Sequence, residues 1–208
     1  MNDQSVAPAA AEDVAWASIN TPLGVEELKS FCRDIERMYR INPLLNFKKW
    51  EAVGENRYLF SGQNISQEEP FDFDLELTVE EKPDGFQIHY QGDLRSSTTF
   101  TIEAAAADSP GLSKLTITDR YDGVSEEERK KQLHRVDRSI VIWAKYLQQF
   151  LYSWKRWSRF RPWRWYMRRV WQPMKPSGRR ITYMLLWISV FEVALILLGV
   201  VIYYLEYA

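Results

Sequence analysis

Only a few side chains in this sequence are of the types that bind metals or act as nucleophiles. The chain contains two histidines, His89 and His134, and one cysteine, Cys32, scattered along its length. Zinc sites draw their ligands from closely spaced cysteine and histidine pairs, and this sequence has no such pair. It also has no HExxH sequence and no glycine-rich phosphate-binding loop. We therefore expect no metal site and no catalytic residue that a motif identifies.

Three carboxylates on one segment have a spacing that resembles a set of metal ligands. Asp72, Asp74 and Glu76 alternate with apolar residues throughout 71–80. Strict alternation is typical of a strand with one buried and one solvated face. We interpret the carboxylates as the solvated face of that strand rather than as a metal site.

The elements that would position any site follow from hydrophobic periodicity and turn residues. A helix is expected from Thr21-Pro22 to about Arg40, and Cys32 lies on its apolar stripe as a core thiol. A single cysteine forms no intramolecular disulfide, which fits a reducing compartment. Seven strands with short loops, hence antiparallel neighbours, are expected at 13–20, 46–53, 57–65, 71–80, 86–94, 97–105 and 112–121.

A helix of about thirty residues is expected from Ser125 onward. Ser125 and the three glutamates after it suit a helix N-terminus, as a cap and as charges that favour the helix dipole. Apolar residues then recur at steps of three and four, which places them on one face. They are Leu133, Val136, Ile140, Trp143, Leu147, Phe150, Trp154 and Trp157. A sheet with one apolar face needs a cover, and this helix provides it, which predicts an α+β fold.

This order of elements, the opening TPLGVEEL of the first helix and the following Asn42-Pro43 resemble the START-like (SRPBCC, polyketide cyclase-like) helix-grip family over residues 13–155. The resemblance implies a curved antiparallel sheet wrapped on the long helix. It also implies an apolar cavity between them that holds a lipid, sterol, quinone or polyketide. With the membrane anchor that we expect at 181–205, the domain is similar as well to a small membrane-recruiting subunit associated with carbon monoxide dehydrogenase, whose family is linked to quinone handling.

The resemblance directs attention to the inward side chains of the sheet and the long helix. An enzyme of the cyclase type would need an acid or base facing the cavity, and His89, Tyr90 and Tyr58 are the candidates. A binding protein needs only an apolar lining. The candidate lining residues are Phe71, Phe73, Phe86, Ile88, Phe100, Ile102, Ile140 and Trp143.

Charge is strongly segregated along the chain, although the formal net charge is only −1. Residues 1–154 carry 17 basic and 26 acidic side chains, whereas 155–180 carry ten basic and no acidic ones. Tryptophan is interleaved with these cations, which suits either single-stranded nucleic acid or a lipid headgroup layer. Because an apolar segment that we expect to cross a membrane follows at 181–205, we favour anionic lipid and expect no nucleic acid.

We call residues 156–180 the collar, and we expect it to lie on the membrane surface. A short interfacial helix is expected from about Trp163 to Trp171, between two prolines. The alternative that the aromatic rings pack onto the domain is compatible with this. The candidate surface residues are Trp157, Arg159, Arg161, Trp163, Arg164, Trp165, Arg168, Arg169, Trp171, Arg179 and Arg180.

Residues 181–205 form an apolar segment with one ionisable side chain, Glu192. A helix of about 20 such residues spans the hydrocarbon core of a bilayer. The cations before it predict a single-pass, tail-anchored protein with its N-terminal domain in the cytoplasm. Ser189, Glu192 and Gly199 share one helical face, which predicts packing against another membrane helix, in a partner protein or a homodimer. Residues 1–12 are expected to be a disordered leader.

Three functional hypotheses follow. The first is a non-enzymatic, membrane-tethered module that holds a quinone, isoprenoid or acyl lipid in its cavity, with the collar keeping the cavity mouth near lipid. The second is an accessory subunit that docks onto an integral membrane complex through its membrane helix and collar. The third is a cyclase-like enzyme. No cofactor is expected beyond such a bound quinone or lipid.

Overall fold

A computed structural model describes residues 14–67, 69–93, 95–106, 112–121 and 126–207, and the side chains of all of these except 126–138. The expected leader at 1–12 lies outside the described residues, as do Leu94 and Ser125 at the ends of predicted elements. Leu133 and Val136 of the predicted stripe belong to the stretch whose side chains are not described.

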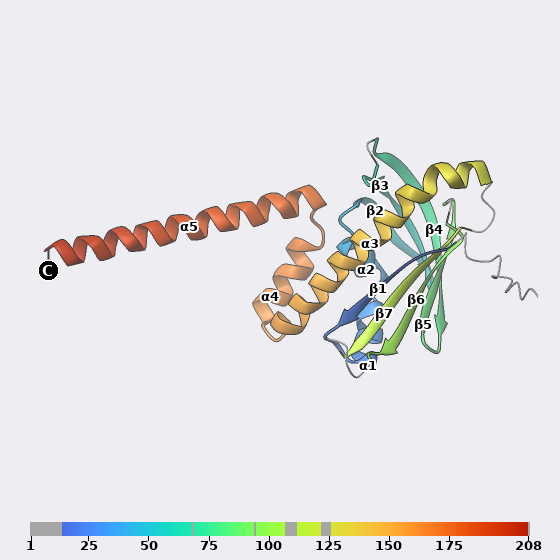
Figure 1. The fold of residues 1–208 in the computed structure, drawn as a ribbon, viewed down its shortest axis with the longest axis horizontal. Coiled ribbons are helices and arrows are strands. Elements are labelled where there is room, and N and C mark those ends of the chain that lie inside the picture. Colours follow the sequence, from blue (N-terminus) through green and yellow to red (C-terminus); the bar gives the residue numbers. More distant parts are fainter. Residues whose placement is uncertain (1–13, 68, 94, 107–111, 122–125, 208) are drawn as a thin grey trace, which may run out of the picture.

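One curved antiparallel sheet forms the body, in the order β1-β7-β6-β5-β4-β3-β2 (Figure 1). Consecutive strands from β2 to β7 pair as hairpins, as their short connections predict. The first strand instead pairs with the last. The strands are β1 (Val14–Thr21), β2 (Leu45–Gly54), β3 (Arg57–Asn64), β4 (Phe71–Lys82), β5 (Gly85–Gln91), β6 (Ser97–Ala104) and β7 (Ser113–Arg120).

The single helix expected between the first two strands is wrong, because the structure has two helices there. These are α1 (Val25–Cys32) and α2 (Ile35–Ile41), separated at Arg33 and Asp34. The Asp34 carboxylate accepts a hydrogen bond from the backbone N–H of Arg37 at 3.1 Å, which caps α2. An aspartate inside an apolar stripe competes for backbone donors in this way and begins a new helix. Cys32 is fully buried, as predicted.

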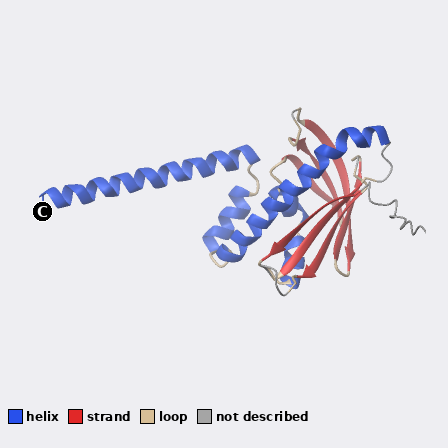
Figure 2. Ribbon diagram, viewed as in Figure 1, coloured by secondary structure: helices blue, strands red, loops and turns tan. Residues whose placement is uncertain are grey.

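The long helix α3 (Glu126–Trp157) crosses the sheet diagonally (Figure 2). Its predicted stripe is buried at Ile140, Trp143, Leu147 and Phe150 and half-buried at Trp154. The stripe is wrong at Trp157, which is 42% exposed because it lies at the end of α3. The Trp143 indole N–H donates to the Met38 carbonyl at 3.1 Å, so the helix is bonded to α2 as well as packed on the sheet.

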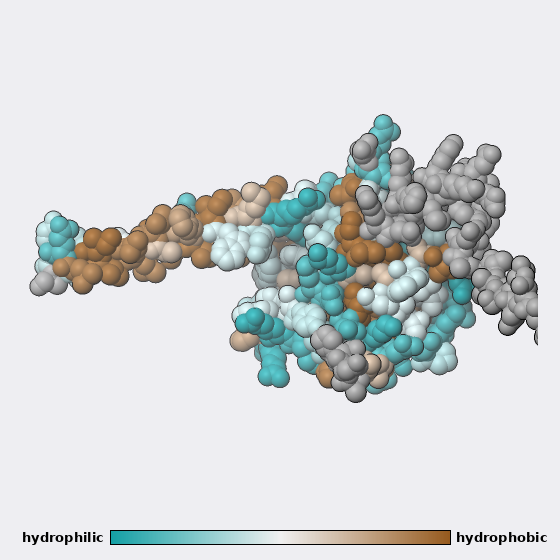
Figure 3. Space-filling model, in the orientation of Figure 1, coloured by the Kyte–Doolittle hydropathy of each residue, from teal (hydrophilic) through white to brown (hydrophobic). Residues whose placement is uncertain are grey.

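The collar folds into α4 (Arg161–Tyr166) and a π-helical turn, η1 (Met167–Trp171), which turn back along α3. The chain then enters α5 (Pro176–Tyr207), which extends away from the body (Figure 1). Every described residue of α5 from Tyr183 onward is exposed. Hydrophobic side chains dominate its surface (Figure 3), and its length and composition are sufficient to cross a membrane.

Candidate ligand-binding site

A cavity of about 370 Å³ lies between α3, the end of α2 and the inner face of the sheet. Pockets that hold small molecules have volumes of about 300–1,000 Å³, so this cavity falls in the lower part of that range. The apolar wall consists largely of aromatic rings. The Tyr39 ring lies 5.3 Å from Trp143 and 5.6 Å from Phe60, and Phe60 lies 4.9 Å from Phe73, all between centroids.

The eight predicted lining residues divide into two groups. Four line the cavity, and the structure brings them together from β4 and α3: Phe71, Phe73, Ile140 and Trp143. Four are buried in the core but do not line it: Phe86, Ile88, Phe100 and Ile102. In that second group the rings of Phe86 and Phe100 stack at 4.5 Å, which fills the space beneath the sheet's centre. Phe71, at the outer end of β4, lines the cavity but is 43% exposed.

Another part of the cavity wall carries charge. Asp119 on β7 is only 3% exposed, and its carboxylate lies 3.9 Å from the Arg95 guanidinium. Arg95 also donates from Nε and from a terminal nitrogen to one oxygen of Asp93, at 2.9 and 2.6 Å. Asp93, Arg95 and Asp119 all line the cavity. A buried charge is stable only when paired and hydrogen-bonded, and this wall meets that requirement internally.

A chain of hydroxyl groups connects this charged wall to the aromatic wall. Thr98 Oγ1 donates to Asp119, and the Tyr90 hydroxyl lies 2.7 Å from Thr98 Oγ1. Tyr39 and Tyr90 are bonded through their hydroxyl groups. Because each hydroxyl has one proton, a Thr98 proton given to Asp119 obliges Tyr90 to donate to Thr98 and Tyr39 to donate to Tyr90. The Tyr39 oxygen then offers the cavity an acceptor.

Comparisons with solved structures match this architecture. The Zhui aromatase/cyclase from Streptomyces sp. R1128 superposes with a TM-score of 0.52 at 9% identity, covering 70% of this chain and 96% of its own. A protein from Thermus thermophilus gives 0.50 at 11% identity, covering 67% and 97%. A START superfamily protein from Mycobacterium smegmatis gives 0.49 at 15% identity, covering 68% and 98%.

The chain has a START-like helix-grip fold. No protein-family model matches the sequence, and no curated protein does. At these identities the likeness concerns the fold alone. The START-like fold therefore explains why there is a cavity, and any function has to be inferred from the side chains that line it.

Of the acid–base candidates named from the sequence, only Tyr90 belongs to this network. His89 points to the outer face of the START-like sheet, where its ring nitrogen lies 3.2 Å from a Glu80 carboxylate oxygen. Tyr58 packs its ring 5.3 Å from Trp50. Among the described residues, no cluster of three or more histidine, cysteine or acidic side chains is arranged to hold a metal ion.

Burial determines the protonation of the START-like cavity's polar wall. Burial raises the pKa of Tyr90 to about 12 and the pKa of Tyr39 well above its ordinary value, so both phenols keep their protons at neutral pH. Burial also raises the pKa of Asp119, although the neighbouring Arg95 opposes this. The Asp119 carboxyl is consequently easier to protonate here than in water.

We expect Asp119→Asn to flatten the pH dependence of stability. The unfolded pKa of aspartate is about 4. Because the folded pKa is higher, this group's contribution to stability is present at low pH and is lost as the pH rises through the folded pKa. The amide cannot titrate, and it can still accept from Thr98. Urea unfolding of both proteins from pH 4 to pH 8 measures the difference. Equal slopes of the free energy of unfolding against pH would contradict a raised pKa of Asp119.

The predicted membrane-surface residues do not share one environment. Most are exposed side chains: Trp157, Arg159, Arg161, Arg164, Trp165, Arg168, Arg169 and Arg180. Two of the tryptophans are instead half-buried and pack onto the START-like body. Trp163 lies 5.7 Å from Trp154, and Trp171 lies 5.4 Å from Phe150. The alternative in which collar rings pack onto the domain therefore holds for these two.

Arg179 connects α5 to the START-like body. Its guanidinium donates to the carbonyls of Arg40 at 2.6 Å, Gln172 at 2.9 Å and Trp171 at 3.0 Å. It also lies 4.1 Å from the centroid of the Trp171 ring. These carbonyls stand at the ends of α2 and η1, where helix carbonyls lack intrahelical partners. One side chain thus bonds three segments together.

The proposed packing face of α5 is continuous in the structure. Ser189, Glu192 and Gly199 lie in one uninterrupted helix and are exposed. A side chain built at Gly199 would meet nothing within 4 Å. No described part of the START-like body covers this face.

Proposed function

We propose that this chain is a membrane-tethered module that holds one hydrophobic ligand with a polar head in its cavity, and that it performs no catalytic step. The observation that carries this proposal is the 370 Å³ cavity, which has both an aromatic wall and a buried, paired charged wall. An apolar pocket with a few convergent polar groups is the usual form of a small-molecule site.

The two walls indicate the kind of ligand. The aromatic wall favours an isoprenoid or acyl chain, or the ring of a quinone, through apolar contact. The Arg95 N–H groups can donate to a carbonyl oxygen, and the Tyr39 oxygen can accept from a hydroxyl group. A ligand head that carries carbonyl or hydroxyl oxygens fits this pair better than a wholly apolar molecule does.

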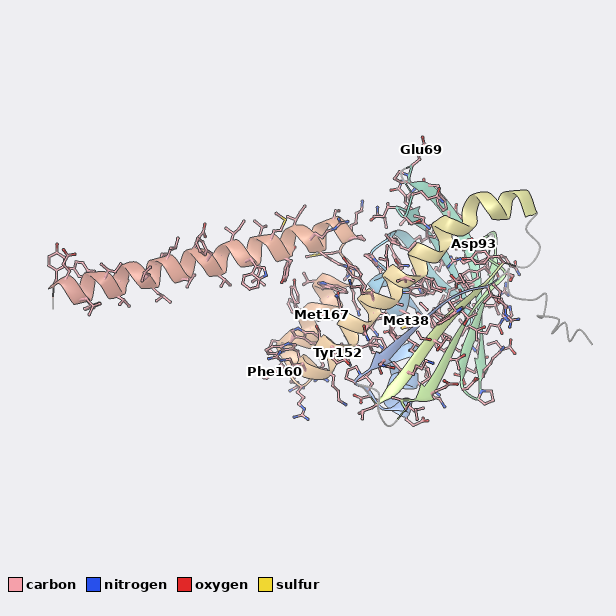
Figure 4. All side chains as sticks on the ribbon, in the orientation of Figure 1. Met38, Glu69, Asp93, Tyr152, Phe160 and Met167 are labelled. Carbon is pink, nitrogen blue, oxygen red and sulfur yellow. The ribbon has the colours of Figure 1, made fainter. Side chains whose placement is uncertain are left out.

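The two ends of the cavity lie at different places relative to α5. Asp93 lies on the side of the body opposite to the direction in which α5 extends (Figure 4). The cavity lining also includes Asn42, only two residues after Arg40, whose carbonyl holds Arg179 at the start of α5. If α5 crosses the bilayer, the charged wall is its far end and the Asn42 end is nearer to lipid.

Mass spectrometry of organic extracts from the full chain, purified in mild detergent, tests the proposal. We expect one enriched lipid or quinone species at near-stoichiometric amount. Ile140→Phe should reduce its retention at least tenfold, because Ile140 is 2% exposed and lines the cavity. Val141→Phe adds the same ring at an exposed neighbouring position and should retain the ligand. Equal retention by both variants, or none by the unmodified chain, would contradict the binding role.

A second candidate function is an accessory subunit that docks onto an integral membrane protein. The observation that favours it is Glu192, halfway along the exposed apolar helix α5. An ionisable side chain at the centre of a bilayer costs several kcal/mol unless it finds a partner. A helix that offers a hydrogen-bond donor to this face would supply one.

We expect Glu192→Leu to weaken any such association and Glu192→Gln to preserve it, since glutamine keeps the hydrogen-bonding group. Co-purification in mild detergent detects a partner membrane protein, and the oligomeric state of the isolated chain detects a homodimer. The docking role predicts a stoichiometric partner that the leucine variant loses. Equal recovery with both variants would remove Glu192 from that role.

A further inference from the structure

The turn between α3 and α4 exposes an unusual concentration of aromatic surface. Trp157 is 42% exposed, Phe160 57% and Trp165 62%. The Trp157 and Phe160 rings lie 5.7 Å apart, so they form one patch instead of two isolated rings. We call residues 156–169 the corner. Exposed apolar patches bordered by charge mark interaction surfaces, and solitary exposed rings do not.

The charged side chains of the corner are all cations, since it contains no acidic residue. The Arg156 guanidinium lies 5.3 Å from the centroid of the Trp157 ring. Within the described part of the chain, no carboxylate lies at ion-pair distance from any of the corner arginines, namely Arg156, Arg159, Arg161, Arg164, Arg168 and Arg169. By contrast Lys155, just before the corner, pairs with Glu27 at 2.7 Å. The corner arginines are therefore available to an external anion.

The inner side of the same segment is fixed to the body. Met167 is 7% exposed, and Trp163 packs on Trp154. Trp165 is consequently exposed, because the other face of α4 and η1 is used for packing. The aromatic side chains therefore form an inner set that packs on the body and an outer set that is exposed. Such a division is typical of a docking surface, whereas a loose tail that binds lipid headgroups would not have it.

The corner and α5 face the same way. Phe160 lies on the side of the body from which α5 extends (Figure 4). The three hydrogen bonds of Arg179 join the start of α5 to η1 and α2, so the corner and α5 have a fixed relation. A bilayer crossed by α5 would therefore run past the corner.

We propose that the corner is a second membrane contact, which inserts Trp157, Phe160 and Trp165 among the headgroups of an anionic lipid surface. This inference rests on the proposed membrane tether and is independent of the cavity's ligand. Tryptophan and phenylalanine bury their apolar bodies at this depth, while arginine binds lipid phosphate through paired N–H groups. Each cation near an anionic surface adds about 1 kcal/mol of attraction. The contact fixes the rotation of the START-like body on the membrane, which α5 alone would leave free.

Spin-label accessibility on the full chain in lipid nanodiscs tests this contact. Labels are attached at Phe160→Cys and, as a control of similar exposure on the sheet, at Trp16→Cys. The native Cys32 is fully buried with its pKa raised to about 12, so it does not compete for the label. Collision rates with oxygen, which concentrates in lipid, and with a water-soluble nickel complex report the depth of each label.

In nanodiscs of phosphatidylcholine and phosphatidylglycerol we expect the oxygen-to-nickel ratio at position 160 to exceed that at position 16 at least threefold. The excess should shrink in phosphatidylcholine alone, and after replacing Arg161, Arg164 and Arg168 together by glutamine. Equal ratios at the two positions in both lipids would overturn the inference. A chain that fails to co-elute with nanodiscs would instead show that the tether itself is wrong.

Discussion

Replacing Trp143 by alanine is expected to lower the free energy of unfolding by about 3–5 kcal/mol, the usual cost of deleting a buried tryptophan. The Trp143 side chain is 2% exposed and lies 5.3 Å from the Tyr39 ring and 5.7 Å from the Phe100 ring. Its N–H also bonds the Met38 carbonyl of α2. One side chain therefore joins the long helix, the second helix and the sheet.

Urea unfolding in mild detergent, followed by far-ultraviolet circular dichroism, measures this loss. Trp143→Phe should cost less, because it keeps a ring in place and loses mainly one hydrogen bond, worth about 1 kcal/mol. Trp16→Ala is the matched control, since that ring is 65% exposed on β1 and its removal should change stability by less than about 0.5 kcal/mol. Equal effects of Trp143→Ala and Trp16→Ala would show that α3 does not hold the body together.

The sheet and the long helix could be predicted from the sequence because each depends on a local period. Leu75 and Leu77 alternate with carboxylates, and both are buried in β4. Ile140 and Leu147 recur at helical spacing, and both are buried on the inner face of α3. The pairing of β1 with β7 could not be predicted in this way. It joins residues about a hundred positions apart, and no short loop specifies it.

The charged wall of the cavity was not predicted, although the sequence position of Asp119, one of its charged residues, indicates a buried polar site. Asp119 follows Leu115 and Ile117 at steps of two, so it occupies an inward position of a strand. A carboxylate at such a position indicates a buried polar site. Arg95, in contrast, lies between β5 and β6, where no period applies. Its approach to Asp119 depends on how the β5–β6 connection folds over the end of the sheet, which is a tertiary property.

The environment of each collar side chain also could not be predicted from the sequence. Composition alone predicts that tryptophan and arginine seek a membrane surface, and it treats Trp163 and Trp165 alike. Only the packing of α4 against α3 separates them, since Trp163 turns toward Trp154 while Trp165 is 62% exposed. Arg179 and Arg180 likewise look equivalent as flanking cations, yet only Arg179 reaches back to the body.

That difference between two neighbouring arginines supports the last prediction. Arg179→Met is expected to release α5 from the body, because its three hydrogen bonds to backbone carbonyls and its contact with the Trp171 ring are lost together. Hydrogen bonds from a charged donor contribute about 1.5–3 kcal/mol each when buried, and these are partly exposed, so we expect a total loss on the order of 2 kcal/mol. Arg180→Met removes the same charge from an exposed neighbour and should leave the junction intact.

Pulsed electron–electron distance measurements between labels at Trp16→Cys and Tyr183→Cys in nanodiscs would compare the two variants. We expect a single narrow distribution for the parent chain and for Arg180→Met, and at least a doubling of its width for Arg179→Met. Arg179→Lys should also broaden it, because an ammonium group cannot reach three carbonyls with the planar geometry of guanidinium. Equally narrow distributions in all variants would mean that the packing of Trp171 on Phe150 is sufficient to orient the helix. The orientation of α5 relative to the START-like body would then depend on the collar's inner rings, without a contribution from the Arg179 hydrogen bonds.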